Sequence, residues 1–213
     1  GSGYLACGDV DTGRMSEPED IVEAVCEVLN PAPQDLAGKR IVITAGPTHE
    51  PIDPVRFIGN RSSGKMGIAL AGEAARRGAA VTLVLGPTSL DVPHGVDCVR
   101  VQTAAEMLQA ALNAFQTADA AICAAAVADY TPAAPADYKL KKANERLDRI
   151  ELVETVDILA ELSRQKGERC VIGFAAETDN VVEYAERKLV RKGCDAIVAN
   201  DVSRADSGFG TDT

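Results

Sequence analysis

Short apolar segments alternate with alanine-rich segments of helical length from residue 39 onward, and this alternation limits the possible folds more than any other feature of the chain. The apolar segments lack in–out periodicity, as is typical of strands buried on both faces of a parallel sheet. Parallel strands need crossover connections, which helices supply. The alternation therefore predicts an α/β fold, with a doubly wound, mostly parallel, Rossmann-like sheet that carries helices on both faces. The predicted strands are residues 40–44, 80–85, 98–101, 120–126, 170–175 and 196–199, and the predicted helices are residues 64–77, 104–115, 156–165 and 180–191.

The first 38 residues do not follow this alternation. Ser16 and Glu19 form a capping-box pattern, and the apolar residues after them recur at helical spacing, so residues 16–29 are predicted to form one amphipathic helix. Two prolines then end the helical pattern. We expect residues 1–38 to be an appended segment with a linker, and residues 39–213 to be one domain.

Composition excludes several classes of protein. Lys and Arg number 22 against 32 Asp and Glu, a formal net charge of −10, which argues against a nucleic-acid binder with a broad basic face. The longest purely apolar run, residues 120–128, is far shorter than the roughly 18 residues of a spanning helix, so no membrane partner is expected. The six cysteines show no CxxC spacing and no signal-peptide pattern opens the chain, which favours buried free thiols in a reducing cytoplasm. An anionic ligand must then be held by a local cluster or a metal.

Two connections are too long to be simple turns. Residues 45–63 join the first strand to its helix, and residues 127–153 contain prolines and a charge-dense stretch. Loops of more than about 12 to 15 residues in compact domains usually have a functional role. Ligands of doubly wound sheets bind beyond the carboxyl ends of the strands, where both connections begin. We expect the first connection to be a binding loop and the second to be a lid.

The glycine fingerprint of dinucleotide-binding proteins is missing. The first strand leads into the sequence AGPT rather than GxGxxG, and the second leads into Gly86-Pro87, where an acidic residue would bind a ribose. Residues 59–66 match the GxxxxGK of a phosphate loop, but Met66 replaces the Ser or Thr that would ligate magnesium. Ordinary NAD binding and a standard P-loop NTPase are therefore both disfavoured.

Ser62 and Gly64 lead into the helix predicted over residues 64–77. The first N–H groups and the positive dipole end of such a helix favour an anion. An ordinary serine-capped helix, with a glycine for close packing, explains the same residues equally well. The sequence leaves both interpretations open.

Charged residues follow other predicted strands. Asp129 follows a buried strand, where one carboxylate and phosphate oxygens could hold Mg²⁺, with a turn or cap role as the alternative. Lys139 belongs to the sequence KLKK, residues 139–142, which is either a phosphate clamp or a solvated charge run. Lys188 and Lys192 share one helix face, which either binds a ligand or is solvated.

Two aromatic side chains are ambiguous. Phe174 ends a predicted strand and could stack on a ligand, although a core position explains it at least as well. His49 lies in a proline-rich loop with no identifiable partner, so we leave it out of the catalytic set.

Taken in order, these segments resemble one family, the phosphopantothenoylcysteine synthetases, in the bacterial form fused behind phosphopantothenoylcysteine decarboxylase. The segments that carry the resemblance are residues 48–56 (THEPIDPVR), 60–67 (NRSSGKMG), 125–130 (AAVADY), 139–142 (KLKK), 173–178 (GFAAET) and 199–202 (ANDV). Residues 6–9 (ACGD) and 13–15 (GRM) resemble the last catalytic loop of the decarboxylase, whose cysteine is a proton donor in that family.

The resemblance divides the chain into two parts. Residues 1–38 are expected to be a decarboxylase remnant with a linker, in which Cys7 is inert because the fold around it is absent. Residues 39–213 are expected to be a synthetase domain, which in this family continues into a further strand and helix after the position of Thr213.

The resemblance implies a two-step ligase of coenzyme A biosynthesis. CTP activates the carboxylate of 4'-phosphopantothenate as an acyl-cytidylate with loss of pyrophosphate, and the amine of L-cysteine then displaces CMP. The resemblance also implies magnesium with the CTP and a homodimer. The rival interpretations are an NAD(P)-dependent oxidoreductase and a nucleotide-binding regulatory domain on the same fold.

Roles for individual residues are implied as well. Asn60 handles the acyl-cytidylate and Lys139 neutralises charge at the α-phosphate, so these two form the catalytic set. Asp129 meets the triphosphate and its magnesium. Thr155-Val156 replaces the Asn-Pro that is usual in the bacterial family, which leaves the side-chain role of Thr155 open. The other implied contacts are with the nucleotide, through Ser62, Gly64, Lys139, Thr155, Val156, Asp157, Ile158, Phe174, Lys188 and Lys192, and with the substrate, through Arg56, Asn60, Ala125 and Ala126.

Overall fold

The computed structural model describes residues 2–4, 10–12, 15, 17–29, 31–141, 148–177 and 179–201. The chain divides into two compact units, Gly1–Asp35 and Leu36–Thr213. The boundary predicted from the sequence lies slightly later, before Lys39. Cys7, Ser16, Lys142 and the chain end after Asp201, about which the sequence made predictions, lie outside the described residues.

The described residues of the first unit form a two-stranded ribbon and a helix. Strands β1 (Ser2–Tyr4) and β2 (Val10–Thr12) pair antiparallel. Helix α1 (Pro18–Leu29) ends at the predicted residue. Its apolar side chains at helical spacing, Ile21, Val22, Val25, Val28 and Leu29, are all exposed.

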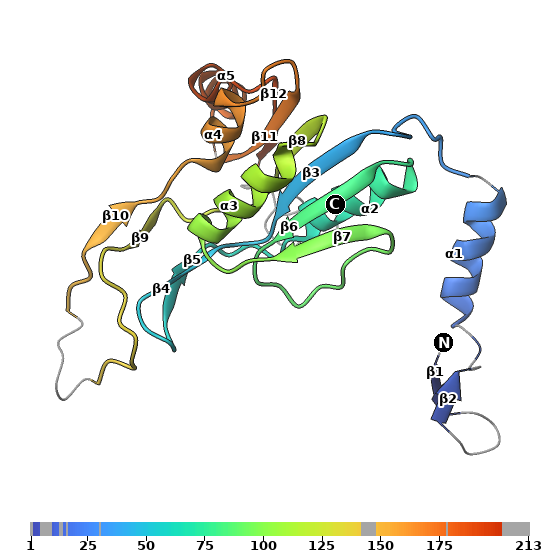
Figure 1. Cartoon of the computed structure of the whole chain (residues 1–213), viewed down its shortest axis with the longest axis horizontal. Helices are drawn as coiled ribbons and strands as arrows, with labels where there is room; N and C mark the ends of the chain where they lie inside the picture. The colour runs from blue at the N-terminus through green and yellow to red at the C-terminus, as the bar shows by residue number, and fades with distance from the viewer. Residues whose placement is uncertain are drawn as a thin grey trace. The chain divides into compact units, whose positions relative to one another are not determined.

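The second unit is built around a six-stranded sheet in which each neighbouring pair of strands is parallel (Figure 1). From β3 the chain moves outward to β6 and β7, returns to the other side of β3 at β8, and continues to β11 and β12. This order, β12-β11-β8-β3-β6-β7, is that of a doubly wound sheet, as the sequence predicted. The six strands are β3 (Arg40–Ala45), β6 (Ala80–Leu85), β7 (Val96–Arg100), β8 (Ala120–Cys123), β11 (Cys170–Glu177) and β12 (Ala196–Asp201).

Helices cover both faces of the sheet, as predicted. Helix α2 packs against β3, β6 and β7 on one face, while α3, α4 and α5 lie on the other face. Alternate residues of β3 serve the two faces, because Ile41 and Ile43 join the cluster under α2 and Val42 joins the cluster under α3 and α4. The helices are α2 (Lys65–Arg76), α3 (Ala104–Phe115), α4 (Ile158–Arg164) and α5 (Val181–Lys192).

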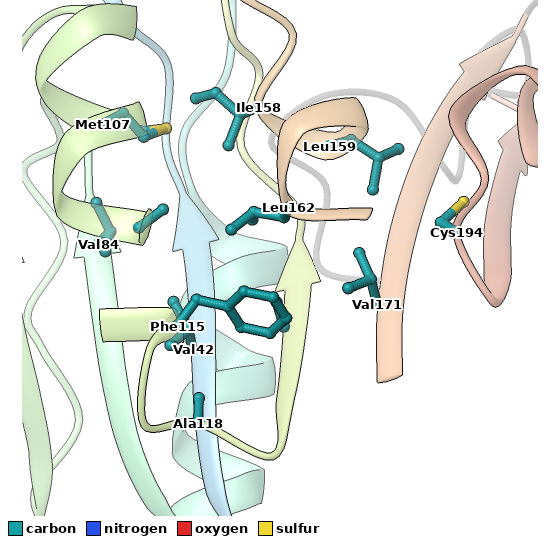
Figure 2. Close-up of a cluster of buried hydrophobic side chains, with 12 residues drawn as sticks. Val42, Val84, Met107, Phe115, Ala118, Ile158, Leu159, Leu162, Val171 and Cys194 are labelled. Carbon is teal, nitrogen blue, oxygen red and sulfur yellow. The ribbon is translucent and has the colours of Figure 1, made fainter. Parts of the chain in front are cut away.

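The larger cluster fixes α4 against the sheet. Phe115, at the end of α3, is 1% exposed and lies in the same cluster as Val42 and Leu162 (Figure 2). The guanidinium carbon of Arg169 sits 3.9 Å from the centre of the Phe115 ring. Burying each such side chain contributes about 1.5 to 3 kcal/mol, so this cluster holds the start of α4 in place.

Several predicted boundaries need correction. The strand predicted over residues 120–126 ends at Cys123, although Ala124 and Ala126 still donate hydrogen bonds to the carbonyls of Thr44 and Gly46, where β3 ends. The helix predicted from residue 156 begins at Ile158, since the Asp157 side chain accepts a bond from the N–H of Ala160 and caps it.

The two long connections contain strands that the sequence did not predict. The first holds the antiparallel pair β4 (His49–Pro51) and β5 (Phe57–Gly59), and the second holds the pair β9 (Tyr130–Pro132) and β10 (Leu152–Glu154). Figure 1 shows both ribbons beyond the carboxyl ends of the sheet strands, and β4 contacts β9. None of the helices in the described part of the chain is long and apolar enough to cross a membrane.

Candidate functional site

A pocket of about 390 Å³ opens at the carboxyl edge of the sheet, on the side of α3, α4 and α5. Neighbouring strands β3 and β8 contribute to it, and these are the strands between which the chain reverses its winding direction. Doubly wound folds bind ligands at such a switch point. The pocket is lined by Thr44, Cys123, Ala125, Val127, Asp129, Tyr130, Glu154, Thr155, Val156, Asp157, Ile158, Leu159, Phe174, Lys188 and Lys192.

Close backbone packing holds the chain in place where it leaves β3 and β6. Gly46 has a φ of 78°, a conformation that disfavours other residues. A Cβ atom on Gly86 would lie 1.8 Å from the carbonyl oxygen of Pro47, so only glycine fits there. The buried hydroxyl of Thr48 accepts a hydrogen bond of 3.0 Å from the N–H of Ala128. The segments that follow β3 and β8 are therefore locked to each other.

Asn60 is tied to the segment after β8. Its side-chain nitrogen donates to the carbonyl oxygens of Ala126, at 3.2 Å, and Val127, at 3.0 Å. The structure thus brings Asn60 beside the segment with Ala125 and Ala126, three of the four residues for which the family resemblance implied contact with the substrate. Asn60 itself is exposed and does not line the pocket.

Thr155 joins two walls of the pocket. Its hydroxyl donates to the carbonyl oxygen of Ala128 at 2.6 Å, and its N–H donates to that of Asp129 at 2.9 Å. Threonine therefore gives this position a side-chain function even without the asparagine that is usual there. Val156 is exposed, whereas the Ile158 side chain belongs to the buried cluster beneath the pocket.

Lys188 and Lys192 line the pocket instead of forming a fully solvated helix face. The Lys188 ammonium donates to the carbonyl oxygen of Phe174 at 2.6 Å. Lys192, whose side chain is only 16% exposed, forms an ion pair with Asp157. Phe174 is half-buried and lines the pocket, and its backbone carbonyl is the group that accepts the bond from Lys188.

Asp129 is an exposed residue that lines the pocket, beside the carboxylate-bearing residues Glu154 and Asp157. In the described ranges, no three His, Cys, Asp or Glu side chains are grouped closely enough to hold a metal ion by themselves. One carboxylate with ligand phosphate oxygens is a common arrangement for Mg²⁺, and Asp129 fits that arrangement. The metal role of Asp129 remains a prediction.

Ser62 and Gly64 lie next to the end of β3 but outside the pocket lining. The N–H of Gly64 donates to the Ser62 hydroxyl at 3.3 Å, and the N–H of Lys65 donates to the Ser63 hydroxyl at 3.4 Å. A Cβ on Gly67 would lie 2.4 Å from that of Ala45, so α2 packs tightly on the strand. Gly64 is the N-cap of α2 and no side chain caps this helix, so the expected serine cap is wrong, whereas the close packing at glycine is confirmed. Anion binding there remains a prediction.

Arg56 and Lys139 also lie outside the pocket lining. Arg56 forms an ion pair with the buried carboxylate of Asp53 and donates to the carbonyl oxygen of Leu140 at 3.0 Å. Lys139 is exposed. The structure therefore places the residue before Leu140 close to the β4–β5 ribbon rather than in the pocket wall.

The ribbon β4–β5 is anchored by residues to which the sequence analysis gave no role. The buried carboxylate of Glu50 accepts a 2.8 Å bond from the N–H of Ala104 at the start of α3. The N–H of His49 donates to the carbonyl of Gln102, and its ring stacks on Phe57 with 3.7 Å between centroids. Burial lowers the pKa of His49. The sequence signal that could have predicted the anchoring role of Glu50 is its charge within a proline-rich loop.

Comparison with known proteins gives one consistent result. A family model described as "DNA/pantothenate metabolism flavoprotein C-terminal domain" matches residues 36–213. Bifunctional CoaBC proteins of coenzyme A biosynthesis are 50% identical over 213 residues in Bacillus subtilis, and 51% identical over 215 residues in Escherichia coli. Each alignment covers 99% of this chain and 52% of the relative, so the chain spans about half the length of the curated relatives it matches.

A solved structure agrees with these relatives. The crystal structure of the C-terminal domain of a CoaBC protein superposes with a TM-score of 0.69 and 51% sequence identity. The match covers 78% of this chain and 79% of the other. The chain is therefore similar to this domain in both sequence and fold.

The pocket thiol is predicted to be unreactive. Burial raises the pKa of Cys123 to about 12, so its thiolate fraction at pH 8 is on the order of 10⁻⁴. Iodoacetamide at pH 8 should alkylate the exposed Cys26 and Cys170 in the native protein and leave Cys123 unmodified, as read by peptide mass spectrometry. All three should react in 6 M guanidinium, which is the control. Native alkylation of Cys123 as fast as that of Cys170 would contradict the prediction.

Proposed function

Because the chain belongs to the family of the DNA/pantothenate metabolism flavoprotein C-terminal domain, we propose that residues 36–213 act as a CTP-dependent phosphopantothenate–cysteine ligase. The observation that carries the proposal is that the residues to which the family resemblance gave nucleotide contacts line one pocket of a chain that matches the family. The chain matches CoaBC proteins over almost its whole length. Its pocket at the switch point is lined by the residues Asp129, Thr155–Ile158, Phe174, Lys188 and Lys192, for which the sequence predicted nucleotide contact.

The proposed reaction has two steps. The carboxylate oxygen of 4'-phosphopantothenate attacks the α-phosphorus of CTP, and the bond from that phosphorus to pyrophosphate breaks. The amine of L-cysteine then attacks the acyl carbon, CMP leaves with the bonding electrons, and the amine loses a proton. Activation replaces a poor leaving group by a good one, so the amide forms without a charged carboxylate opposing the attack.

The pocket residues are proposed to hold the nucleotide. Lys188 and Lys192 supply two positive charges, and their present partners, the Phe174 carbonyl and the Asp157 carboxylate, keep both ammonium groups at the wall. Asp129 would hold a magnesium ion, which when bound offsets the charge of the triphosphate. Thr155 to Ile158 would border the base and ribose. Local cations are needed because the chain as a whole carries a net charge of −10.

Residues around the segment after β8 are proposed to hold the acyl group. Asn60 lies within hydrogen-bond distance of the Ala126 and Val127 carbonyls, so its amide is already oriented at this segment. Arg56, Ala125 and Ala126 complete the proposed substrate contacts. Lys139, which is exposed on the segment after β9, would meet the charge that develops at the α-phosphate.

The assembly around this domain is also a proposal. Residues 1–38 are proposed to be the end of a fused decarboxylase domain with its linker, and the enzyme is proposed to work in the cytoplasm as a homodimer. Exposed apolar side chains on and near the two ribbons support a dimer, since apolar side chains left in water favour burial against a partner. They are Val55, Phe57, Tyr138, Ile150, Leu152 and Val153.

Replacing Lys139 tests the activity and its proposed electrostatic source together. The wild-type chain should couple phosphopantothenate with cysteine when CTP and magnesium are present, read by mass spectrometry of the product. Lys139→Gln should lower turnover by about 10²- to 10³-fold, the usual cost of losing one oriented charge. Lys39→Gln, a change to an exposed lysine just before β3, is the matched control and should leave turnover intact. Coupling with ATP or NADPH but not with CTP would overturn the proposal.

Replacing Asn60 should separate the two steps. Asn60→Asp removes the side-chain N–H donors that bond to Ala126 and Val127 and adds a negative charge near the acyl phosphate. Pyrophosphate release should continue while the acyl-cytidylate accumulates, seen by mass spectrometry in quenched reactions. Asn113→Asp, on an exposed turn of α3, is the control. Rapid formation of the cysteine adduct by Asn60→Asp would contradict the assigned role.

The proposed dimer can be tested at the second ribbon. Sedimentation equilibrium should give twice the chain mass for the wild type and about one chain mass for Val153→Asp, since a buried carboxylate in an apolar interface is costly. Val190→Asp on α5 makes the same change at a side chain that is 83% exposed, and should remain dimeric. A monomeric wild type would refute the proposed assembly.

A further inference from the structure

The segment that follows β9 is held at defined points rather than only at its ends. The N–H of Ala133 donates to the Glu151 carbonyl at 2.9 Å, next to the β9–β10 ribbon. The N–H of Ala136 donates to the carbonyl of Ile52 in the other ribbon at 3.0 Å. Leu140 is half-buried, while Lys139 before it is exposed. The exposed lysine therefore stands on a backbone that contacts the β4–β5 connection.

Asp53 is the centre of that contact. Its side chain is fully buried, and its Oδ1 atom accepts bonds of 2.8 Å from the N–H groups of Val55 and Arg56 in its own turn. Its Oδ2 atom accepts from the guanidinium of Arg56 and, at 3.2 Å, from the N–H of Leu140, which is 87 residues away. One carboxylate thus serves a local turn with one oxygen and a distant segment with the other.

Arg56 binds the carbonyl group of Leu140, the residue whose N–H group Asp53 binds. The guanidinium that pairs with Asp53 also donates to the carbonyl oxygen of Leu140 at 3.0 Å. Both the N–H and the C=O of Leu140 are therefore bound to the Asp53–Arg56 pair. These two groups belong to the peptide bonds on either side of Leu140, so the backbone next to Lys139 is fixed.

We propose that Asp53 is a positioning residue that, through Arg56, holds the Leu140 peptide groups and so presents Lys139 to the reacting phosphate. The chemical part of this inference rests on the proposed function, whereas the holding of the segment does not. The pair fixes the backbone on both sides of Leu140, so less ordering is left for the reaction step.

A local role alone does not explain a charged residue here. Asparagine and serine satisfy the N–H groups of such a turn without a buried charge. Burying a carboxylate is costly unless donors surround it, and five donors do: the N–H groups of Val55, Arg56 and Leu140, and two guanidinium nitrogens of Arg56. The guanidinium of Arg56 accordingly holds the pKa of Asp53 well below its usual range. The charge pairs with the Arg56 guanidinium, which in turn donates to the distant Leu140 carbonyl.

The variant Asp53→Asn tests the contact directly. An amide offers one acceptor oxygen, so either the turn or the Arg56 and Leu140 donors must face its NH₂ group. Trypsin cleaves after lysine and needs the bond to be locally unfolded, so it reports how often the segment is released. The fragment ending at Lys139 should form at least about tenfold faster than in the wild type, as measured by mass spectrometry under native conditions.

Asp195→Asn is the matched control. Asp195 also accepts a backbone N–H, from Val171 at 2.7 Å, and a lysine, Lys166 at 2.6 Å, but it precedes β12 at the opposite end of the sheet strands. This variant loses a comparable contact and should lose some stability, yet cleavage after Lys139 should stay at the wild-type rate. If Asp53→Asn is cleaved no faster than the wild type, or if Asp195→Asn is cleaved equally fast, the positioning role is wrong.

The kinetic readout separates positioning from general damage. Because the pocket lining does not include the segment around Leu140, Asp53→Asn should lower kcat for pyrophosphate release by about tenfold or more and leave KM for CTP within about twofold. Rapid cleavage with an unchanged kcat would overturn the positioning role. If the wild type shows no ligase activity at all, the proposed function fails while the protease result still decides whether Asp53 holds the segment.

A second variant covers the case in which Asp53→Asn does not fold. Arg56→Lys keeps the Asp53 carboxylate and its bonds to Val55 and Leu140, and removes the forked donor that reaches the Leu140 carbonyl. Its rate of cleavage after Lys139 should lie between those of the wild type and a fully released segment. A wild-type cleavage rate for Arg56→Lys would show that Arg56 does not hold the Leu140 carbonyl, and the proposal would be rejected.

Discussion

The close crossing of the segments that leave β3 and β8 is the constraint on which the site depends. The N–H of Ala126 donates to the Gly46 carbonyl at 2.9 Å, and the N–H of Thr48 donates back to the Ala126 carbonyl at 3.3 Å. Only glycine at position 86 lets the chain after β6 pass the carbonyl of Pro47. Backbone groups are thereby paired where two parallel strands diverge, and a pocket can open beside them without leaving buried polar groups unsatisfied.

Each functional element is positioned relative to this crossing. Asn60 reaches it from the β5–α2 connection through the carbonyls of Ala126 and Val127. Thr155 is connected to the crossing through its hydrogen bond to the Ala128 carbonyl. This bond positions the start of α4, where Asp157 pairs with Lys192. The β4–β5 ribbon, anchored on α3 by Glu50, carries the Asp53–Arg56 pair to the segment with Lys139. Binding groups from five separate parts of the chain are thus connected, directly or through neighbouring elements, to the segments that leave β3 and β8.

The sequence predicted the sheet well because buried parallel strands have a simple pattern. All six strands, the four helices on the sheet and the doubly wound order follow from apolar runs such as residues 80–85, and β6 has the predicted bounds. The ribbons were missed, since β4, β5, β9 and β10 are only three residues long, too short to show an alternating pattern, and three of them contain a proline or a charge. Whether such short strands pair depends on tertiary contacts such as those of Glu50 with Ala104 and of His49 with Gln102. A local sequence pattern does not show these contacts.

Much of the pocket was predictable for a different reason, since the carboxyl edge of the sheet and the family resemblance both pointed to it. The Asp53–Arg56–Leu140 contact was not, because it joins residues 84 and 87 positions apart. Hydrogen–deuterium exchange with CTP and magnesium tests most directly whether the nucleotide occupies the switch point. Exchange should slow in residues 123–130 and 154–160 and stay unchanged in residues 86–95. Unchanged exchange at 123–130 and 154–160 with saturating CTP, or protection there by NADPH alone, would contradict binding of the nucleotide at the switch point.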